Sequence, residues 1–259
     1  AVGTRLATEC LSHHQTVVHI DIDAEEIGRH HANTVAVAGD ARRTLEQLQK
    51  ALLADLPPRP SRRREMEAFR RERFDPRATT EPQGGFVRAI RSAMPDDGIV
   101  VEGTTQVGYM AGVHYPVHRP GTYLTSSYFG NLGFAFPTAL GAKVARPQAA
   151  VVAISGDGGF LYNSQELATA VLYGINAVVV VFNDGAFGNV LRDQKTRFGG
   201  RIVGSRLRNP DYVKLAQAYG ARAVRVADAA ELRPALQEAL EVNAPTLIEV
   251  PVGEMPFSW

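Results

Sequence analysis

Two aspartates, each beside glycine, follow two successive apolar runs of strand length. Asp157 lies in the sequence SGDGG after the run AAVVAI, and Asp184 lies in NDG after the run AVVVVF. In a parallel sheet the carboxyl ends of the strands share one edge, and ligands bind there. The two carboxylates are therefore expected to meet at that edge if the strands are neighbours. Carboxylate oxygens are hard ligands that suit Mg²⁺ or Ca²⁺, and no set of His and Cys accompanies them to favour zinc.

The glycines around Asp157 have a chemical role of their own. Gly156, Gly158 and Gly159 lack a Cβ, so backbone N–H groups here can approach an anion closely. A divalent ion together with N–H groups at a helix start is what a diphosphate requires. A single Gly-Asp-Gly also occurs in ordinary tight turns, and that alternative stays open for either motif alone. The pair of acidic strand ends favours a metal-assisted diphosphate site.

From about Gly84 onward, strand patterns alternate with helix patterns. Strands are predicted over residues 98–103, 149–158, 176–185, 221–226 and 245–252. Helices are predicted over residues 85–92, 164–174, 210–220 and 229–242, with a glycine-rich loop and helix over 128–145. A long irregular stretch is expected to run on to about Arg208. Strands and helices that alternate in this way form right-handed βαβ units, so residues 83–259 are predicted to be an α/β domain with a mostly parallel, doubly wound sheet.

Residues 1–55 show a shorter version of the same pattern. Strands are predicted over 16–23 and 34–40, a short helix from Ala24, and an amphipathic helix over 41–56. This pattern is typical of the C-terminal half of a second, Rossmann-like α/β domain. Because AVGTRLATEC has the pattern of a strand end and its loop, the chain is predicted to be a fragment, a processed product or one subunit of a divided enzyme.

Residues 56–82 form the predicted linker, which is rich in Pro and Arg and has a helical middle over 62–73. Its arginines suggest a patch for a phosphate backbone. The interleaved Glu65, Glu67 and Glu72 favour the alternative, a solvated helix face.

The composition argues against several classes of function. A hydrophobic fraction of 45% is enough for a folded core, and a formal net charge of +1 gives no general case for nucleic acid. The single cysteine, Cys10, excludes an internal disulfide and fits a reducing compartment, so a cytoplasmic location is expected. No apolar run is long enough to cross a bilayer, so no membrane partner is expected.

The paired motif SGDGGF and FNDGAF, with a helix and a strand between, has the form of a known signature, GDG followed by NN. In this it resembles the acetolactate synthase-like (acetohydroxyacid synthase) group of thiamine-diphosphate-dependent enzymes. The likeness extends from TYLTSSYFGNLGFAFPTALGAKVA through NPDYVKLAQAYGARAVRV to PTLIEVPVGEMP. Residues 1–55 are similar to the second half of that family's central domain, with HIDIDAEEIG close to the usual IDIDPAEIG. The resemblance therefore covers nearly the whole chain.

The resemblance implies thiamine diphosphate and Mg²⁺ as cofactors and gives each site residue a role. The implied metal ligands are the carboxylates of Asp157 and Asp184 and the carbonyl of Ala186. The residues implied to bind the cofactor are Thr105, Gln106, Gly130, Asn131, Leu132, Gly156, Gly158, Gly159, Phe187 and Gly188. Among these, the carbonyl of Gly130 is implied to accept from the aminopyrimidine amine. Leu132 is implied to hold the cofactor bent, with an ordinary core leucine as the alternative.

Three positions depart from the family pattern. Asp184 replaces the usual second Asn, and its charge beside Asp157 is expected to strengthen Mg²⁺ binding and to destabilise the metal-free site. The stretch GTRLATECLSHH replaces the acidic RFDDR of members that bind FAD, which argues against FAD here. Asp193, in LRDQ, replaces the tryptophan of RQWQ, so acetolactate synthesis itself is not implied.

The activity that the resemblance implies is that of a 2-keto-acid decarboxylase or carboligase, acting through an enamine at C2 of the thiazolium ring. In the family the activating glutamate lies on a separate pyrimidine-binding domain, and neither Glu102 nor Glu166 is expected to replace it. The chain is therefore predicted to be inactive alone and to need a segment or chain that bears that domain. The active site is implied to form in a homo- or hetero-oligomer of at least two protomers, with a small 2-keto acid as substrate.

Three alternatives stay open. The same cofactor serves oxidases and enzymes that cleave C–C bonds as lyases or hydrolases. A non-catalytic, cofactor-binding regulatory subunit would also lack the activating glutamate. The third alternative is a metal-dependent phosphate-transfer protein, which would have in common with these enzymes only the acidic residues at the strand ends.

Overall fold

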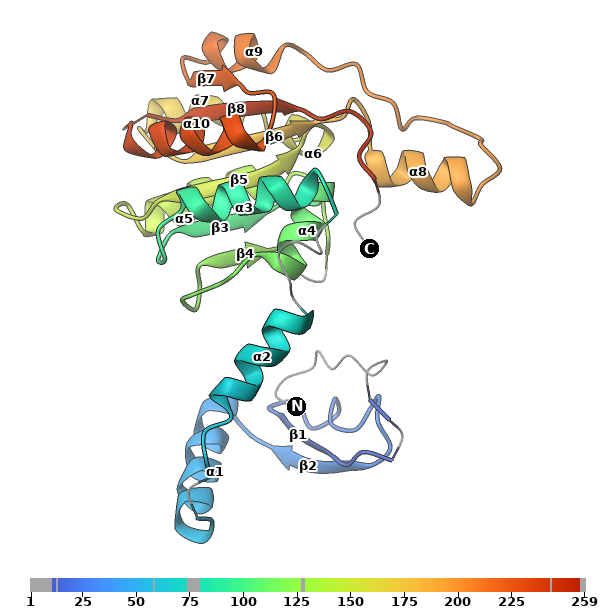
Figure 1. The fold of residues 1–259 in the computed structure, drawn as a ribbon, viewed down its shortest axis with the longest axis vertical. Coiled ribbons are helices and arrows are strands. Elements are labelled where there is room, and N and C mark those ends of the chain that lie inside the picture. The colour runs from blue at the N-terminus through green and yellow to red at the C-terminus, as the bar shows by residue number, and fades with distance from the viewer. Residues whose placement is uncertain are drawn as a thin grey trace. The chain divides into compact units, whose positions relative to one another are not determined.

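The computed structural model describes residues 11–12, 14–57, 59–73, 80–126, 129–242 and 244–256. The chain forms two compact units, residues 1–67 and 68–259, and each is described by itself (Figure 1). Cys10 and most of the stretch that argues against FAD lie outside the described residues. The predicted limits at residues 55 and 82 remain a prediction.

The second unit is built on one six-stranded sheet. In chain order its strands are β3 (Ile99–Glu102), β4 (Tyr123–Thr125), β5 (Val151–Gly156), β6 (Val178–Asn183), β7 (Arg222–Arg225) and β8 (Thr246–Pro251). Their order in space is β4-β3-β5-β6-β8-β7, and every neighbouring pair is parallel. The predicted α/β class with a mostly parallel sheet is confirmed.

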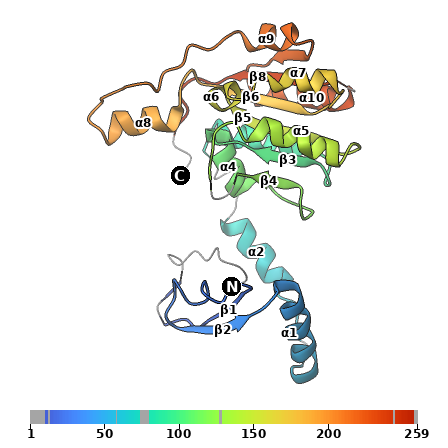
Figure 2. The same ribbon diagram turned by 180° about the vertical axis from the view of Figure 1, so that it is seen from behind.

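Helices cover both faces of this sheet (Figures 1 and 2). The helices on one face are α3 (Gln83–Ala93), α4 (Gln106–His114) and α10 (Ala229–Glu241). Those on the other face are α5 (Ala135–Ala145), α7 (Glu166–Leu172) and α9 (Tyr212–Ala218). Successive residues of a strand point to opposite faces, so Val178 and Val180 join the first core and Val179 and Val181 the second. This double burial explains why β5 and β6 are continuous apolar runs.

Three helices of this unit differ from the sequence prediction. Asp157 begins a short helix, α6 (Asp157–Leu161), where a simple turn was expected. Helix α8 (Gly188–Thr196) interrupts the stretch predicted to be irregular, and it projects away from the sheet (Figure 1). Helix α4 was missed because it is apolar on all sides and lacks the helical periodicity that sequence analysis detects.

The first unit contains a parallel pair of strands, β1 (Val17–Asp21) and β2 (Thr34–Ala38), and helix α1 (Ala41–Asp55). The side chain of Asp40 caps α1 by accepting from the N–H of Arg43. The short helix predicted from Ala24 is wrong, because the backbone there forms successive turns. Helix α2 (Arg63–Arg73) spans the boundary between the two units.

Among the described residues, no helix combines the length and the apolar character needed to cross a bilayer.

Candidate functional site

The two aspartates of the opening motif lie at the carboxyl ends of neighbouring strands. Strand β5 pairs with β6, with Gly156 opposite Phe182, so Asp157 and Asp184 leave the sheet side by side. Strand β3 lies on the other side of β5 and brings the loop with Thr105 to the same edge. The expectation that the acidic strand ends share one edge is confirmed.

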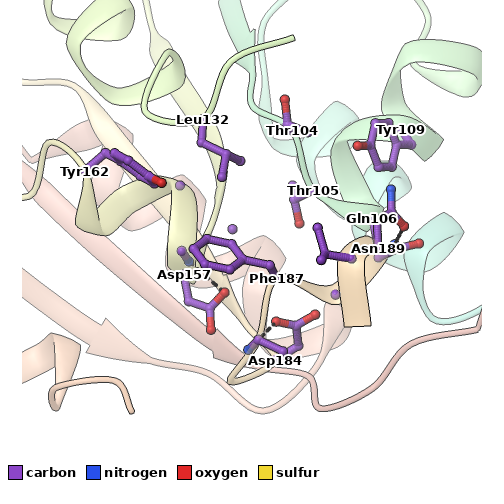
Figure 3. Close-up of a pocket in the computed structure, with 16 residues that line it drawn as sticks. Thr104, Thr105, Gln106, Tyr109, Leu132, Asp157, Tyr162, Asp184, Phe187 and Asn189 are labelled. Carbon is purple, nitrogen blue, oxygen red and sulfur yellow. Dashed lines mark hydrogen bonds between the residues drawn. The ribbon is translucent and has the colours of Figure 1, made fainter. Parts of the chain in front are cut away.

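A cavity of about 350 Å³ opens at this edge of the sheet. Its lining residues are Thr104, Thr105, Gln106, Tyr109, Leu132, Gly156, Asp157, Gly158, Gly159, Tyr162, Asp184, Ala186, Phe187, Gly188, Asn189 and Val190. Figure 3 shows the two carboxylates on one side of this cavity, with Leu132, Thr104 and Tyr109 on the other. Eleven of the thirteen residues predicted for the site therefore line one cavity.

Asp157 is held by a dense set of hydrogen bonds. It is only 2% exposed. Its Oδ2 accepts from the N–H of Gly185 at 2.8 Å and from the amide of Asn209 at 2.6 Å, and its Oδ1 accepts from the N–H of Gly158 at 2.8 Å. The backbone carbonyl of Asp157 accepts from the Tyr212 hydroxyl at 3.2 Å. These bonds fix the carboxylate at the end of β5.

Asp184 is in an environment that disfavours its charge. Burial, and after it the neighbouring Asp157 carboxylate, raise the pKa of Asp184 to about 7, and the hydrogen bond from Ala186 N–H opposes this shift. Two buried carboxylates that face each other repel when both are ionised. A divalent cation between them would favour the charged form of both.

The backbone beside these aspartates is packed too closely for side chains. A Cβ on Gly158 would lie 2.5 Å from the ring of Phe187, and one on Gly156 would lie 3.3 Å from Thr105. A Cβ on Gly188 would overlap the carboxylate of Asp184. Glycine at position 158 therefore allows α6 to approach the metal loop, residues 184–187 between β6 and α8, and glycine at position 188 leaves room for the Asp184 carboxylate.

Two of the N–H groups predicted for the diphosphate already have acceptors. The N–H of Gly158 donates to Asp157, and the N–H of Phe187 donates to the carbonyl of Ser205 at 2.8 Å. The N–H of Leu207 likewise donates to Gly185, so residues 205–207 pair with the metal loop on both sides of Ala186. Those pairings do not use the carbonyl of Ala186, which is the third predicted metal ligand.

Gln106, predicted to bind the cofactor, lines the cavity and also joins two helices. It is the first residue of α4, and its buried side-chain amide donates to Asn189, which also accepts from Arg192 at 2.9 Å. Its side chain therefore joins α4 to α8. Thr105, the residue before the helix, lies against Gly156 as the predicted second loop requires.

Gly130 and Asn131 are the two predicted site residues that do not line the cavity. The carbonyl of Gly130 accepts from the Thr104 hydroxyl at 3.2 Å. A carbonyl oxygen has two lone pairs, so this bond leaves one for the aminopyrimidine amine. Leu132 does line the cavity, which favours the predicted contact role over an ordinary core leucine.

Five lining residues were missed by sequence analysis: Thr104, Tyr109, Tyr162, Asn189 and Val190. Three of them lie on helices that were missed, Tyr109 on α4 and Asn189 and Val190 on α8, and Thr104 lies beside the predicted Thr105. Asn209 was missed as well, because it precedes the predicted helix from 210 and carries no signal of its own beyond a helix start.

The residues of the site fit a magnesium ion bound together with a diphosphate. Within the described part of the chain, no group of three or more His, Cys, Asp or Glu is arranged to hold a metal. Two carboxylates and one backbone carbonyl are a partial set of oxygen ligands, and Mg²⁺ commonly takes its remaining ligands from phosphates and water. Burial and the neighbouring Asp157 raise the pKa of Asp184, so a cation bound beside the two carboxylates would stabilise the charged form of Asp184.

Comparison with known proteins agrees with this chemistry. Residues 103–250 match the model of the thiamine pyrophosphate enzyme family, C-terminal TPP binding domain. The matched segment includes every residue that lines the cavity, and both aspartates are among them. The chain belongs to this family and contains its thiamine-diphosphate-binding domain.

Individual relatives are acetolactate synthases and decarboxylases. The chain is 36% identical over 246 residues to a probable acetolactate synthase large subunit of Methanocaldococcus jannaschii, covering 90% of this chain and 42% of the relative. It is 34% identical over 262 residues to the probable 2-ketoarginine decarboxylase AruI of Pseudomonas aeruginosa, covering 96% and 46%. The solved 4-hydroxybenzoylformate decarboxylase of Rhodococcus jostii, a thiamine-diphosphate-dependent enzyme, matches with a TM-score of 0.72 and 29% identity over 92% of this chain and 44% of that one. The chain thus spans less than half the length of these relatives.

Proposed function

We propose that this chain is part of a thiamine-diphosphate- and Mg²⁺-dependent 2-keto-acid decarboxylase or carboligase. The observation that supports this most is the pair of carboxylates at the ends of β5 and β6, the buried Asp157 and the half-buried Asp184, beside a cavity lined by glycines. The names of the relatives, which include synthases and decarboxylases that act on 2-keto acids or use this cofactor, support the same class.

In this proposal the chain's own residues bind and orient the cofactor. Asp157, Asp184 and the carbonyl of Ala186 would hold Mg²⁺, which would supply positive charge for the diphosphate, and the N–H groups of Gly156 and Gly159 would be available to its oxygens. Leu132 and Phe187 present apolar surface to the cofactor and exclude water from the reacting end of the cavity. When bound, thiamine diphosphate supplies the electron sink for breaking the bond to the carboxylate of the 2-keto acid.

The proposal also needs a partner. Because the chain spans less than half the length of its relatives, we assign the activating glutamate to a pyrimidine-binding domain on a further segment or chain. The active site then forms in an oligomer of at least two protomers. We place the enzyme in the cytoplasm, which the single cysteine supports.

Cofactor binding tests the proposal directly. Thiamine diphosphate is titrated by calorimetry into this chain assembled with the segment or chain that bears the pyrimidine-binding domain, after metal removal, with and without added Mg²⁺. Binding is expected only with Mg²⁺, and Asp157→Ala is expected to weaken it by about 100-fold or more, since the variant loses a metal ligand. Asp97→Ala, at an exposed position before β3, is the control and should bind like the unmodified chain. Equal binding by Asp157→Ala would refute the metal assignment, and no binding at any Mg²⁺ concentration would refute the proposal.

Turnover separates the enzyme from a regulatory subunit. CO₂ release is measured from pyruvate and a panel of larger 2-keto acids, using the holoprotein together with the chain that supplies the pyrimidine-binding domain. Turnover of at least one substrate supports the proposal. Cofactor binding without turnover in the complete assembly would instead identify a non-catalytic cofactor-binding subunit.

A further inference from the structure

A continuous path of hydrogen bonds leads away from the cavity, behind the metal-binding edge. The amide of Asn209 donates from one nitrogen to two acceptors, Asp157 Oδ2 at 2.6 Å and Asn183 Oδ1 at 2.8 Å. Asn183 in turn donates from Nδ2 to Glu249 at 2.9 Å, and Glu249 accepts from Arg225 at 2.8 Å. Four side chains from β6, β7, β8 and the α8–α9 connection thus lead from Asp157 to the far edge of the sheet.

The chemistry of the two ends fixes the direction of every bond in this path. A guanidinium can only donate and an ionised carboxylate can only accept, so Arg225 and Glu249 set the polarity at one end. Asn183 must then turn its NH₂ toward Glu249 and its oxygen away from it. The N–H of Gly185, which cannot accept, lies 3.3 Å from that oxygen and confirms this orientation.

Asn209 is oriented by the same logic. Its nitrogen faces two oxygens, Asp157 Oδ2 and Asn183 Oδ1, and a flipped amide would place three oxygens together. The orientation leaves Asn209 Oδ1 buried without a protein hydrogen-bond partner among the described residues. An unpaired buried amide oxygen is unfavourable, so this arrangement is better explained by what the nitrogen does than by fold stability.

The path determines which part of Asp157 remains for a metal. A carboxylate has about four acceptor positions. Both positions on Oδ2 are used, by Gly185 and Asn209, and one on Oδ1 is used by Gly158. A single acceptor position on Oδ1 is left.

Burial makes the path sensitive to its outer end. The side chain of Glu249 is 3% exposed, whereas that of Arg225 is 48% exposed and also contacts Asp211 at 3.0 Å. Removing the guanidinium leaves a buried carboxylate with Asn183 as its remaining side-chain partner, which is costly. The carboxylate of Glu249, no longer held by Arg225, can then shift, and this loosens the hydrogen bond that positions Asn183 and, through Asn183, Asn209.

We infer that Asn209, Asn183, Glu249 and Arg225 are positioning residues that present one Oδ1 lone pair of Asp157 to the metal of the cofactor. None of the four lines the cavity, so they act through Asp157 and not on the cofactor itself. The inference rests on the proposed metal-dependent binding of thiamine diphosphate.

The test measures metal affinity and not activity. Mn²⁺, which replaces Mg²⁺ at oxygen sites, is titrated with saturating thiamine diphosphate into this chain assembled with the segment or chain that bears the pyrimidine-binding domain, and free Mn²⁺ is followed by electron paramagnetic resonance. Asn209→Leu, of similar size, is expected to weaken Mn²⁺ binding by about 10- to 100-fold, the range typical of groups that orient metal ligands. Asn33→Leu is the control, because the exposed Asn33 makes one side-chain hydrogen bond, to Thr16, in the first unit.

The outer end of the path gives a second, milder set of variants. Arg225→Ala is expected to weaken Mn²⁺ binding less than Asn209→Leu does, and Arg225→Lys, which keeps the ion pair with Glu249, to restore most of the affinity. A purely structural role would lower the unfolding temperature of both Arg225 variants without separating their metal affinities. This series decides the question if Asn209→Leu does not fold.

The outcomes distinguish this inference from the proposed function. If the unmodified chain binds no Mn²⁺ with thiamine diphosphate, the proposed function fails. If the unmodified chain binds both while Asn209→Leu and Arg225→Ala bind Mn²⁺ with unchanged affinity, only the positioning role is overturned.

Discussion

At position 184, the replacement of an amide by a carboxylate changes the charge of the candidate binding site. An aspartate stands here where the family signature has an asparagine, and it lies beside a second buried carboxylate. The extra charge makes the metal-free site less favourable and gives a cation more to gain by binding. Metal binding and folding are therefore coupled at this residue.

Asp184→Asn is expected to stabilise the metal-free protein and to weaken metal binding at the same time. The amide keeps an oxygen ligand but removes the repulsion with Asp157. In the presence of a chelator the melting temperature should rise by about 2–4 °C for each kcal/mol gained. With Mg²⁺ and thiamine diphosphate the variant should gain less stability on ligand addition than the unmodified chain. A lower melting temperature in the chelator would contradict the electrostatic argument.

The folding stability is expected to depend on pH through Glu102, which is not one of the predicted metal ligands. Burial raises the pKa of Glu102, and a hydrogen bond from the Tyr123 hydroxyl at 2.6 Å offsets part of that shift. Between the ordinary pKa of 4.5 and the raised one, the folded state holds more protons than the unfolded state, so stability falls as pH rises. Glu102→Gln keeps an acceptor for Tyr123 and removes the charge.

The Gln variant should therefore lose less stability than the unmodified chain as pH rises from about 4.5 toward neutrality. Urea unfolding at several pH values measures this difference. Glu241→Gln, at an exposed position, serves as the control. Parallel curves for Glu102→Gln and the unmodified chain would show that the raised pKa has no effect on folding.

At the scale of elements, the site depends on how closely α6 approaches the metal loop. A Cβ on Gly158 would lie 2.5 Å from Phe187, so Gly158→Ala must displace the loop between β6 and α8. We expect this variant to weaken Mg²⁺-dependent cofactor binding by at least about 10-fold, a loss of about 1.4 kcal/mol.

Gly141→Ala is the matched control for that change. Gly141 lies in helix α5, and a Cβ there would meet no atom within 4 Å. Alanine is the better helix former by about 1 kcal/mol, so this variant should be slightly more stable and bind the cofactor normally. Equal cofactor affinity in both variants would mean that the loop tolerates the displacement.

Some helices and strands could be predicted from the sequence and others could not. Strands β5 and β6 were predicted because burial on both faces leaves an unbroken apolar run. The metal residues were predicted because they follow those strands directly. Helices α4, α6 and α8 were not predicted, since α4 is apolar on all sides, α6 is short and α8 has Leu191 as its one buried residue. Side chains from these helices complete the cavity. Asn209 is brought to Asp157 only by the tertiary fold, which no local pattern records.

For the whole molecule, the two units should differ in stability. The central strands of the second unit are fully buried, whereas the first unit has two strands, and helix α1 has no buried residue. A two-stranded sheet with one exposed helix is marginally stable by itself. Backbone amides in β1, β2 and α1 are therefore expected to exchange with D₂O about 100-fold faster than those in β5 and β6.

Hydrogen exchange read by mass spectrometry on the chain alone checks this expectation. Peptides from β7, at the sheet edge, provide an internal reference of intermediate protection. Protection of α1 equal to that of β5 would show that the first unit is stabilised by contacts that its own residues do not supply.

The glycines at the carboxyl edge of the sheet also limit which residues can change when the substrate specificity of this protein changes. At Gly158 and Gly188 a Cβ would overlap neighbouring atoms, and at Gly156 it would make a tight contact of 3.3 Å with Thr105. Substitutions at these positions are expected to weaken cofactor binding, so new substrate preferences must arise from other residues of the cavity wall. A library for altered specificity should keep Gly156, Gly158 and Gly188 constant and vary Tyr109, Tyr162 and Val190, whose side chains face the same space.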